Sequence, residues 1–146
     1  MAPLYPTRRL SFALARSSLV FRVLKTLLTG RHWPYYRALK PYLAGRVLDI
    51  GCGTGELGHL IPLPYVGVDT DLVFLRAARR QVPRGRVLAA DGVRLPFRTG
   101  TFAVALLIDA LPHLSDVQAA QTLEEACRVA KGGVVVLDPI PPDRRG

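Results

Sequence analysis

The sequence predicts an α/β fold, with a mostly parallel sheet of about five strands and helices on both faces. Three observations predict it. Short apolar segments alternate with amphipathic ones, turn residues separate them, and a chain of 146 residues is long enough for a single core. Strands that alternate with helices pair in parallel through right-handed crossovers. We therefore expect a three-layer sandwich that binds a ligand beyond the carboxyl ends of its first two strands.

Each element follows from its local pattern. Residues 10–28 favour a helix with a broad apolar arc, which Gly30 would end. The segment from Trp33 to Leu43 favours a second short helix, with Pro34 near its first turn. The expected strands then cover residues 46–50, 65–69, 86–90, 102–108 and 133–137, and the expected helices between them cover 71–82 and 115–130.

Charge is distributed unevenly along the chain. It has 20 Lys and Arg against 11 Asp and Glu, a formal net charge of +9, and residues 1–48 contain no acidic residue. The excess therefore belongs to a basic N-terminal helical segment, residues 1–44, which precedes the ligand-binding domain at 45–146. Its basic residues, within 8–46, admit several interpretations: a lid, a cover for the sheet edge, a contact with anionic lipid or nucleic acid, or a transit peptide.

The most informative segment is VLDIGCGTG, residues 47–55, in which an apolar strand runs into Asp49 and then into a glycine loop. The glycines are Gly51, Gly53 and Gly55. Glycine permits a tight turn and lets backbone N–H groups approach a ligand closely. A helix expected to begin near Thr54, and to stop before Pro62, would point its positive end at the same place. The pattern predicts a nucleotide-like ligand, and Asp49 favours a cationic one over a pyrophosphate.

This segment closely resembles the first motif of class I S-adenosylmethionine (SAM)-dependent methyltransferases. Similar motifs follow in order. Residues 67–69 resemble the second strand of the family, residues 90–97 the third, and residues 101–104 and 111–114 the fourth strand and its exit loop. Residues 125–133 resemble the helix and turn before the fifth strand. The nearest likeness is to a small-molecule branch that includes quinone-biosynthesis methyltransferases. The resemblance implies a Rossmann-like fold, SAM as cofactor and no metal.

The resemblance also implies a role for each polar group. Asp49 would attract the ammonium end of SAM, directly or through water, and the three glycines would allow close approach of the backbone. Asp69 would accept both ribose hydroxyls, because Asp71 fits the N-cap of the next helix better. Asp91 and the N–H of Gly92 would meet the adenine. Two leucines, Leu72 and Leu95, are candidates either for packing on the adenine or for the core.

Asp109 and His113 follow the fourth strand, where the family places groups that face the substrate. His113 would either remove a proton from the acceptor or serve as a structural loop residue. Asp109 is either a substrate contact or part of the approach to the next helix. Little base catalysis is required, because the enzyme mainly aligns donor and acceptor for in-line displacement.

The family sheet usually has two further strands that form an antiparallel hairpin, which this chain lacks. Strand five would then be an open edge, covered by the N-terminal helices, by a second subunit in a homodimer, or by missing sequence. The two cysteines, Cys52 and Cys127, are too few for a disulfide framework and favour a cytoplasmic setting, peripheral to a membrane if the basic segment binds lipid.

Three functions follow. The first is methyl transfer from SAM to a small-molecule or lipid-like acceptor. The second is SAM binding without catalysis, which the missing strands suggest. The third is a dinucleotide-dependent oxidoreductase, since residues 53–58 match G-x-G-x-x-G. The third is disfavoured because Asp49 and Glu56 would place negative charge on both sides of a pyrophosphate.

Overall fold

The computed structural model describes residues 37–62 and 64–138. The helix predicted over residues 10–28 and the first part of the helix predicted from Trp33 lie outside these ranges. The described part of the second helix has helical backbone at 37–39 and continues as a short 3-10 helix, η1 (Lys40–Tyr42). No helix in the described ranges has both the length and the apolar character needed to cross a bilayer.

The described chain contains one sheet of five strands in the order β3-β2-β1-β4-β5, and every neighbouring pair is parallel. The strands are β1 (Val47–Ile50), β2 (Tyr65–Asp69), β3 (Arg86–Ala89), β4 (Val104–Ile108) and β5 (Val134–Leu137). All five lie within their predicted ranges, and the parallel α/β sandwich is confirmed. The strand order reverses beside β1, so the carboxyl ends of β1, β2 and β4 surround the position where such sheets bind ligands.

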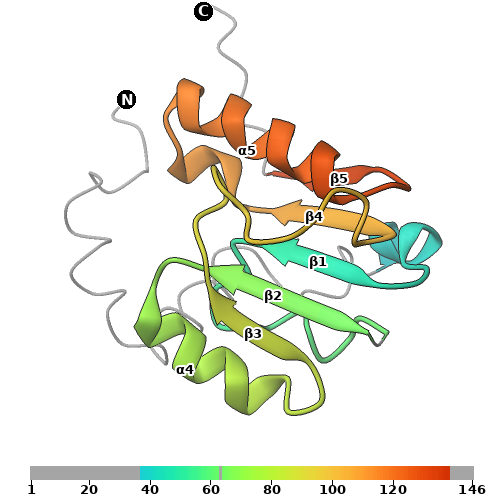
Figure 1. Ribbon diagram of the computed structural model, residues 1–146. Coiled ribbons are helices and arrows are strands. Elements are labelled where there is room, and N and C mark those ends of the chain that lie inside the picture. The colour runs from blue at the N-terminus through green and yellow to red at the C-terminus, as the bar shows by residue number, and fades with distance from the viewer. Residues whose placement is uncertain (1–36, 63, 139–146) are drawn as a thin grey trace, which may run out of the picture.

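Two helices cover opposite faces of the sheet, α4 (Leu72–Gln81) below β2 and β3 and α5 (Asp116–Val129) above β4 and β5 (Figure 1). The side chain of Asp71 caps α4 by accepting from the N–H groups of Val73 and Phe74, as predicted. Ser115 and Gln118 form a reciprocal capping box at the start of α5. Both helix starts are thus encoded locally.

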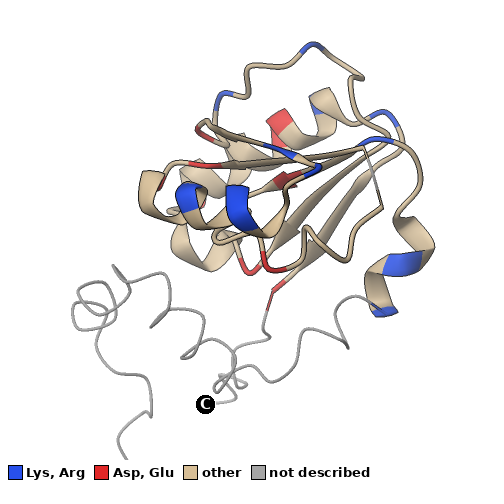
Figure 2. Ribbon diagram, turned by 90° about the horizontal axis from the view of Figure 1, so that it is seen from below, with Lys and Arg blue, Asp and Glu red and all other residues tan. Residues whose placement is uncertain are grey.

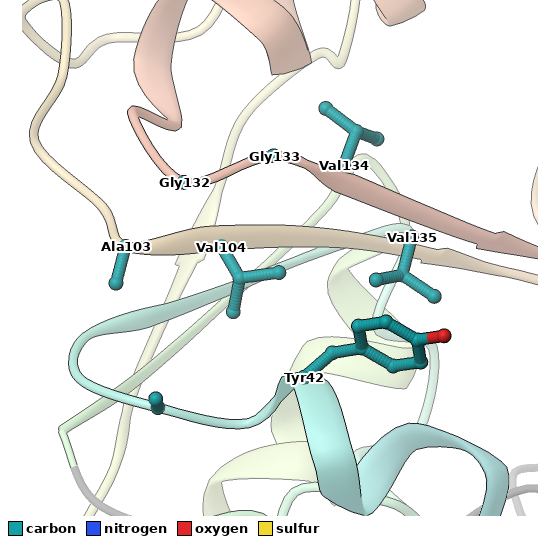
Figure 3. A pocket seen from close by; sticks show the side chains of 8 residues that line it. Tyr42, Ala103, Val104, Gly132, Gly133, Val134 and Val135 are labelled. Carbon is teal, nitrogen blue, oxygen red and sulfur yellow. The ribbon is translucent and has the colours of Figure 1, made fainter.

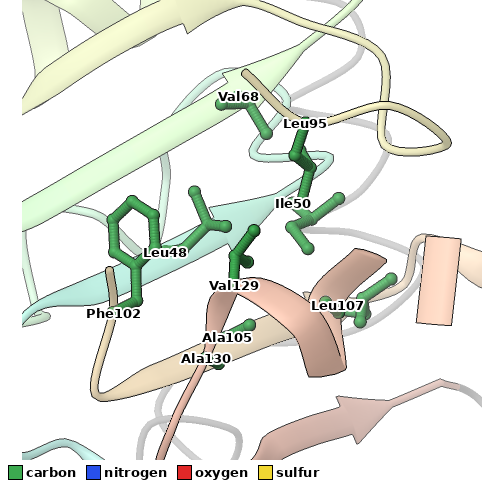
Figure 4. Packing of buried hydrophobic residues seen from close by; sticks show 10 residues of the cluster. Leu48, Ile50, Val68, Leu95, Phe102, Ala105, Leu107, Val129 and Ala130 are labelled. Atoms are coloured by element: carbon green, nitrogen blue, oxygen red, sulfur yellow. The ribbon is translucent and has the colours of Figure 1, made fainter. Parts of the chain in front are cut away.

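The core has two layers because successive strand residues point to opposite faces. On the α5 face, Leu48 and Ile50 pack with Phe102, Leu107 and Val129 (Figure 4). The other face has its own cluster, made of Leu39, Val47, Ile61, Tyr65, Val82, Val104 and Leu106. A four-residue strand buried on both faces, as β1 is, fixes the starting point of the glycine loop.

The helix predicted to begin near Thr54 is not formed, and that prediction was wrong. Residues 51–61 make consecutive turns, in which the N–H of Gly55 donates to Cys52 O and that of Gly58 donates to Gly55 O. Gly55 has φ +76°, which a right-handed helix cannot include. A Cβ on Gly55 would lie 3.0 Å from backbone and side-chain atoms of Ala78, so this segment packs its bare backbone against α4. Within the described residues, no helix begins in this loop.

Candidate functional site

The glycine loop lies at the carboxyl end of β1, beside β2. The N–H groups of Gly51 and Cys52 both donate to the carbonyl of Val68, at 2.8 and 3.0 Å. Gly53 has φ +54°, in the left-handed region, and a Cβ added there would meet nothing within 4 Å. The loop is therefore fastened to β2 on one side and faces open space at Gly53, which suits a cradle for a ligand.

Asp69 ends β2 and connects the loop to the start of α4. Its Oδ2 accepts from the N–H of Gly53 and its Oδ1 from the N–H of Asp71, both at 2.9 Å. Each carboxylate oxygen has a second lone pair, so these bonds leave capacity for two hydroxyl donors. The residue predicted to bind the ribose is thus held in a fixed position at the open side of the loop.

Asp49 lies beneath the loop and is 4% exposed. The hydroxyl of Tyr65 donates to its Oδ2 at 2.8 Å, from a side chain that is 2% exposed. Burial, and then the charge of Asp49, raise the pKa of Tyr65, so the hydroxyl remains a donor. Burial, followed by the charges of Asp49 and Asp69, likewise raises the pKa of the Cys52 thiol. The carboxylates beneath the loop thus disfavour ionisation of both neighbouring groups.

Three glycines make room for the ring of Tyr65. A Cβ on Gly58 would lie 3.0 Å from Cζ of the ring, one on Gly67 would lie 2.9 Å from the hydroxyl oxygen, and one on Gly85 would lie 2.9 Å from Cδ1. Real Cβ atoms are almost never that close to a neighbour. The slot therefore fixes where the hydroxyl lies, and with it the carboxylate of Asp49. Sequence inspection missed this pair, whose members are 16 residues apart.

Asp91 and Gly92 follow β3 at the same edge of the sheet, where the N–H of Ala90 donates to the carbonyl of Asp69 at 3.1 Å. Asp91 is exposed, and among the described residues its side chain accepts a local bond from the N–H of Val93 at 3.1 Å. Gly92 is seated on the core, since a Cβ there would lie 3.1 Å from Ile50. The structure thus brings both predicted adenine residues next to Asp69.

The loop after Asp91 is held by an ion pair on α5. The Nε of Arg128 lies 2.6 Å from Oε1 of Glu125, and this guanidinium also donates to the carbonyls of Phe97 and Leu95 at 2.8 and 3.2 Å. Glu125 accepts from the N–H of Leu95 at 2.7 Å, and its hydrogen bond with Arg128 holds the pKa of the carboxyl below its usual value. The i,i+3 spacing of the pair was the available signal, and sequence inspection did not use it.

The two leucines considered for contact with the adenine differ in their exposure to solvent. Leu95 is 4% exposed and belongs to the core beside α5 (Figure 4). Leu72 opens α4 directly after the Asp71 cap and is 60% exposed. Of the two, Leu72 is the one available to a ligand.

Asp109 and His113 lie at the carboxyl end of β4, as predicted. Asp109 has φ +55°, and its N–H donates to the carbonyl of Leu137 at 2.7 Å. His113 is exposed in the short helix η2 (Leu111–His113). Asp138 follows β5 at the same end of the sheet. Burial raises the pKa of Asp138, the charge of Asp109 raises it further, and the charge of His113 lowers it. The three groups therefore lie close enough for their charges to interact. A Cβ on Gly51 would lie 3.2 Å from Ala110, so this end of β4 adjoins the glycine loop.

An apolar hollow lies at the opposite end of the sheet, at the amino ends of β4 and β5. Tyr42 faces Val135 across it, and Ala103 and Gly132 form its far side (Figure 3). It holds no carboxylate and none of the predicted ligand residues, so it is not the site defined above.

A parallel sheet of this order, with a glycine loop after β1 and carboxylates at the ends of β1, β2 and β3, is typical of a Rossmann-like nucleotide-binding protein. Residues 47–133 match the family described as "Methyltransferase domain". The chain belongs to this family, within the class I SAM-dependent methyltransferases, and the family cofactor is SAM. The open loop at Gly53 and the row of carboxylates fit that cofactor.

Among curated relatives, the chain is similar to demethylmenaquinone methyltransferase of Corynebacterium kroppenstedtii, with 37% identity over 102 residues that cover 66% of this chain and 42% of the relative. It is also similar to an O-methyltransferase of Penicillium expansum, with 30% identity over 118 residues that cover 70% and 43% of the two chains. The chain thus spans less than half the length of these relatives.

Solved structures agree with the fold. A protein of Pyrococcus horikoshii OT3 superimposes with a TM-score of 0.68 and 26% identity, covering 80% of this chain and 63% of the other. A SAM-dependent methyltransferase of Thermotoga maritima gives a TM-score of 0.70 at 24% identity, covering 86% and 60%. The second likeness bears on the fold alone.

Proposed function

We propose that this chain binds SAM and transfers its methyl group to a small-molecule or lipid-like acceptor. The observation that carries the proposal is the line of carboxylates at one edge of the sheet, Asp49, Asp69 and Asp91, around a loop that opens at Gly53. A phosphate ligand would meet negative charge at each position, whereas a sulfonium nucleoside has a donor or a positive group for each.

Each residue has a distinct role in this proposal. Asp69 accepts the ribose hydroxyls on its remaining lone pairs, and Asp91 accepts from the adenine amino group while the N–H of Gly92 donates to the ring. Asp49, being almost fully buried, attracts the ammonium group from beneath the loop, directly or through water. Bound SAM supplies an activated methyl group on a sulfonium.

The acceptor side is formed by Asp109, His113 and Asp138. We propose that these residues orient the acceptor, and that the exposed imidazole of His113 takes up its proton. The relatives named for demethylmenaquinone and for ubiquinone biosynthesis support a quinone-like acceptor. Residues 45–146 would form the SAM-binding domain, and residues 1–44 a lid or edge cover.

Calorimetry with SAM and its demethylated product, S-adenosylhomocysteine, tests the binding half. Asp69→Asn should weaken both ligands by roughly 1.5–3 kcal/mol, because it removes a charged acceptor from hydroxyl donors. Asp116→Asn, at an exposed position in the first turn of α5, is the matched control and should bind as the wild type does. Absence of binding in the wild type would contradict the proposal.

Turnover tests the catalytic half. Purified protein is incubated with methyl-labelled SAM and a fractionated lysate, and label is counted separately in lipid, small-molecule, RNA and protein fractions. We expect label in the lipid or small-molecule fraction, which His113→Ala reduces without changing SAM affinity. Binding with no label in any fraction would instead favour a SAM-binding protein without catalysis, the second function open from the sequence.

A further inference from the structure

One side of α4 and the neighbouring edge strand form a basic face that the site described above does not use. It consists of Arg76, Arg79 and Arg80 on α4, with Arg84 and Arg86 at the turn and the start of β3. All five are exposed, and residues 72–90 contain no acidic residue. Figure 2 views the molecule from below and shows blue bands of basic residues along this helix.

Helical spacing gathers the three arginines of α4 on one side. Positions 76, 79 and 80 are related by i,i+3 and i,i+4, which places them next to one another, away from the buried Leu75 and Ala78. Like charges at this spacing repel and lower helix stability. None of the five arginines forms an ion pair or side-chain hydrogen bond with another residue of the described ranges. A face that only had to be solvated would reduce this repulsion by including carboxylates.

The same side of α4 also exposes apolar side chains. Val73, at its first turn, is 43% exposed, and Leu72, which is 60% exposed, lies where this face borders the ligand site. They lie beside Asp69 and Asp71, at the ligand end of the sheet, and the arginines continue from them along the helix. Apolar residues next to arginines on one helix side match an anionic lipid surface, where the apolar groups enter the interface and the guanidinium groups meet lipid phosphates.

We propose that this basic face docks the protein on an anionic membrane surface, with α4 lying along the surface. RNA is the competing polyanion. Proteins that bind single-stranded RNA combine basic grooves with aromatic side chains on which bases stack. The only aromatic residue within 72–90 is Phe74, which is half-buried, so the face lacks such a platform. Docking through α4 would hold the ligand end of the sheet close to lipid-soluble molecules.

Vesicle sedimentation tests the proposal with the full-length protein and no SAM, so its outcome does not depend on methyl transfer. Phosphatidylcholine vesicles are compared with vesicles that also contain phosphatidylglycerol. The test variant carries Arg76→Gln, Arg79→Gln and Arg80→Gln. The matched control carries Lys40→Gln, Arg98→Gln and Lys131→Gln, which removes the same charge from exposed positions elsewhere. Far-UV circular dichroism and thermal unfolding establish that both variants fold.

We expect the wild type and the control to bind only the vesicles with phosphatidylglycerol. One arginine near such a surface contributes roughly fivefold to the partition coefficient, so the test variant should lose on the order of 100-fold. Val73→Ser should give a smaller loss at unchanged charge, and this variant keeps the proposal testable if the triple variant does not fold.

Three results would overturn the proposal. The first is no binding of the wild type to anionic vesicles. The second is an equal loss in the test and control variants, which would mean that net charge alone is responsible. The third comes from fluorescence anisotropy with a labelled single-stranded RNA: if RNA binding, and not vesicle binding, depends on Arg76, Arg79 and Arg80, the face binds nucleic acid.

Discussion

Replacing Tyr65 by phenylalanine removes one buried hydroxyl and leaves the ring in its slot. In the wild type this hydroxyl donates to the carboxylate of Asp49 at 2.8 Å, and the two residues are 2% and 4% exposed. A buried hydrogen bond to a charged acceptor contributes roughly 1.5–3 kcal/mol. We expect Tyr65→Phe to lower the free energy of unfolding by an amount in that range, measured by urea denaturation at neutral pH.

The effect on binding should depend on which part of the cofactor a ligand contains. If Tyr65 positions Asp49 for the ammonium group, and roughly half of the lost free energy is felt by the ligand, S-adenosylhomocysteine should bind roughly 4- to 13-fold more weakly. 5′-Methylthioadenosine contains the adenosine but no amino acid, so its affinity should not change. Isothermal titration calorimetry measures both ligands. Tyr42→Phe, at a tyrosine that is 59% exposed, is the control.

A double-mutant cycle with Asp49→Asn shows whether Tyr65 acts through that carboxylate. We expect the double variant to bind S-adenosylhomocysteine no more weakly than Asp49→Asn alone, because the hydroxyl then has no charged partner to position. The reasoning is refuted if Tyr65→Phe weakens both ligands equally, which would indicate general damage to the loop, or if the two substitutions are additive.

Three further predictions concern the glycine loop, the ion pair between Glu125 and Arg128, and the two thiols. Gly53→Val forces a β-branched residue to φ +54° at an open position, so S-adenosylhomocysteine binding should be lost while the melting temperature falls by only a few degrees; a large fall would place Gly53 in the core. The pKa of Glu125 is lowered in the folded protein, so the wild type should be more stable than Glu125→Gln above the ordinary glutamate pKa. This advantage should disappear as the pH falls through the lowered value. Urea denaturation at neutral pH and at pH about 3 checks this, and a difference in stability that does not depend on pH would exclude the linkage. Iodoacetamide at pH about 8 should alkylate the exposed Cys127 and leave Cys52 unmodified, because burial and the charge of Asp49 disfavour the Cys52 thiolate. Mass spectrometry of the peptides measures both sites, and faster reaction of Cys52 would contradict the prediction.

Local patterns were sufficient to predict most of the fold. Every observed strand lies within its predicted range, and Asp71 caps α4 as predicted, because alternating burial and capping residues are encoded over a few neighbouring positions. The helix expected after β1 does not form, because tertiary packing determines the backbone conformation of that segment. The segment containing Gly55 presses its backbone against Ala78, a contact that no local pattern reveals.

The candidate site was predictable where the parallel-sheet rule applies, since carboxylates at successive strand ends must meet at one edge. The family resemblance pointed to Asp69 and Asp91, and this rule explains why the two residues lie at the same edge. The contact between Tyr65 and Asp49 was not, because it depends on the register that places Asp49 opposite Gly67, where the missing side chain admits the hydroxyl. The basic face of α4 was hidden for another reason: beyond residue 48 the basic and acidic residues are equal in number, and a count over so long a stretch conceals a local cluster.

The bond between Asp69 and the N–H of Gly53 joins the end of β2 to the glycine loop. Contacts within the fold itself thus hold the cradle in place, so little conformational entropy remains to be lost on association. A rigid site of this kind contacts mainly the adenosine and the amino acid, which SAM and S-adenosylhomocysteine share. It contacts the methyl group, by which the two differ, far less. We expect the spent product to compete strongly with fresh donor, so that its removal, more than the chemical step, governs how fast the enzyme can cycle.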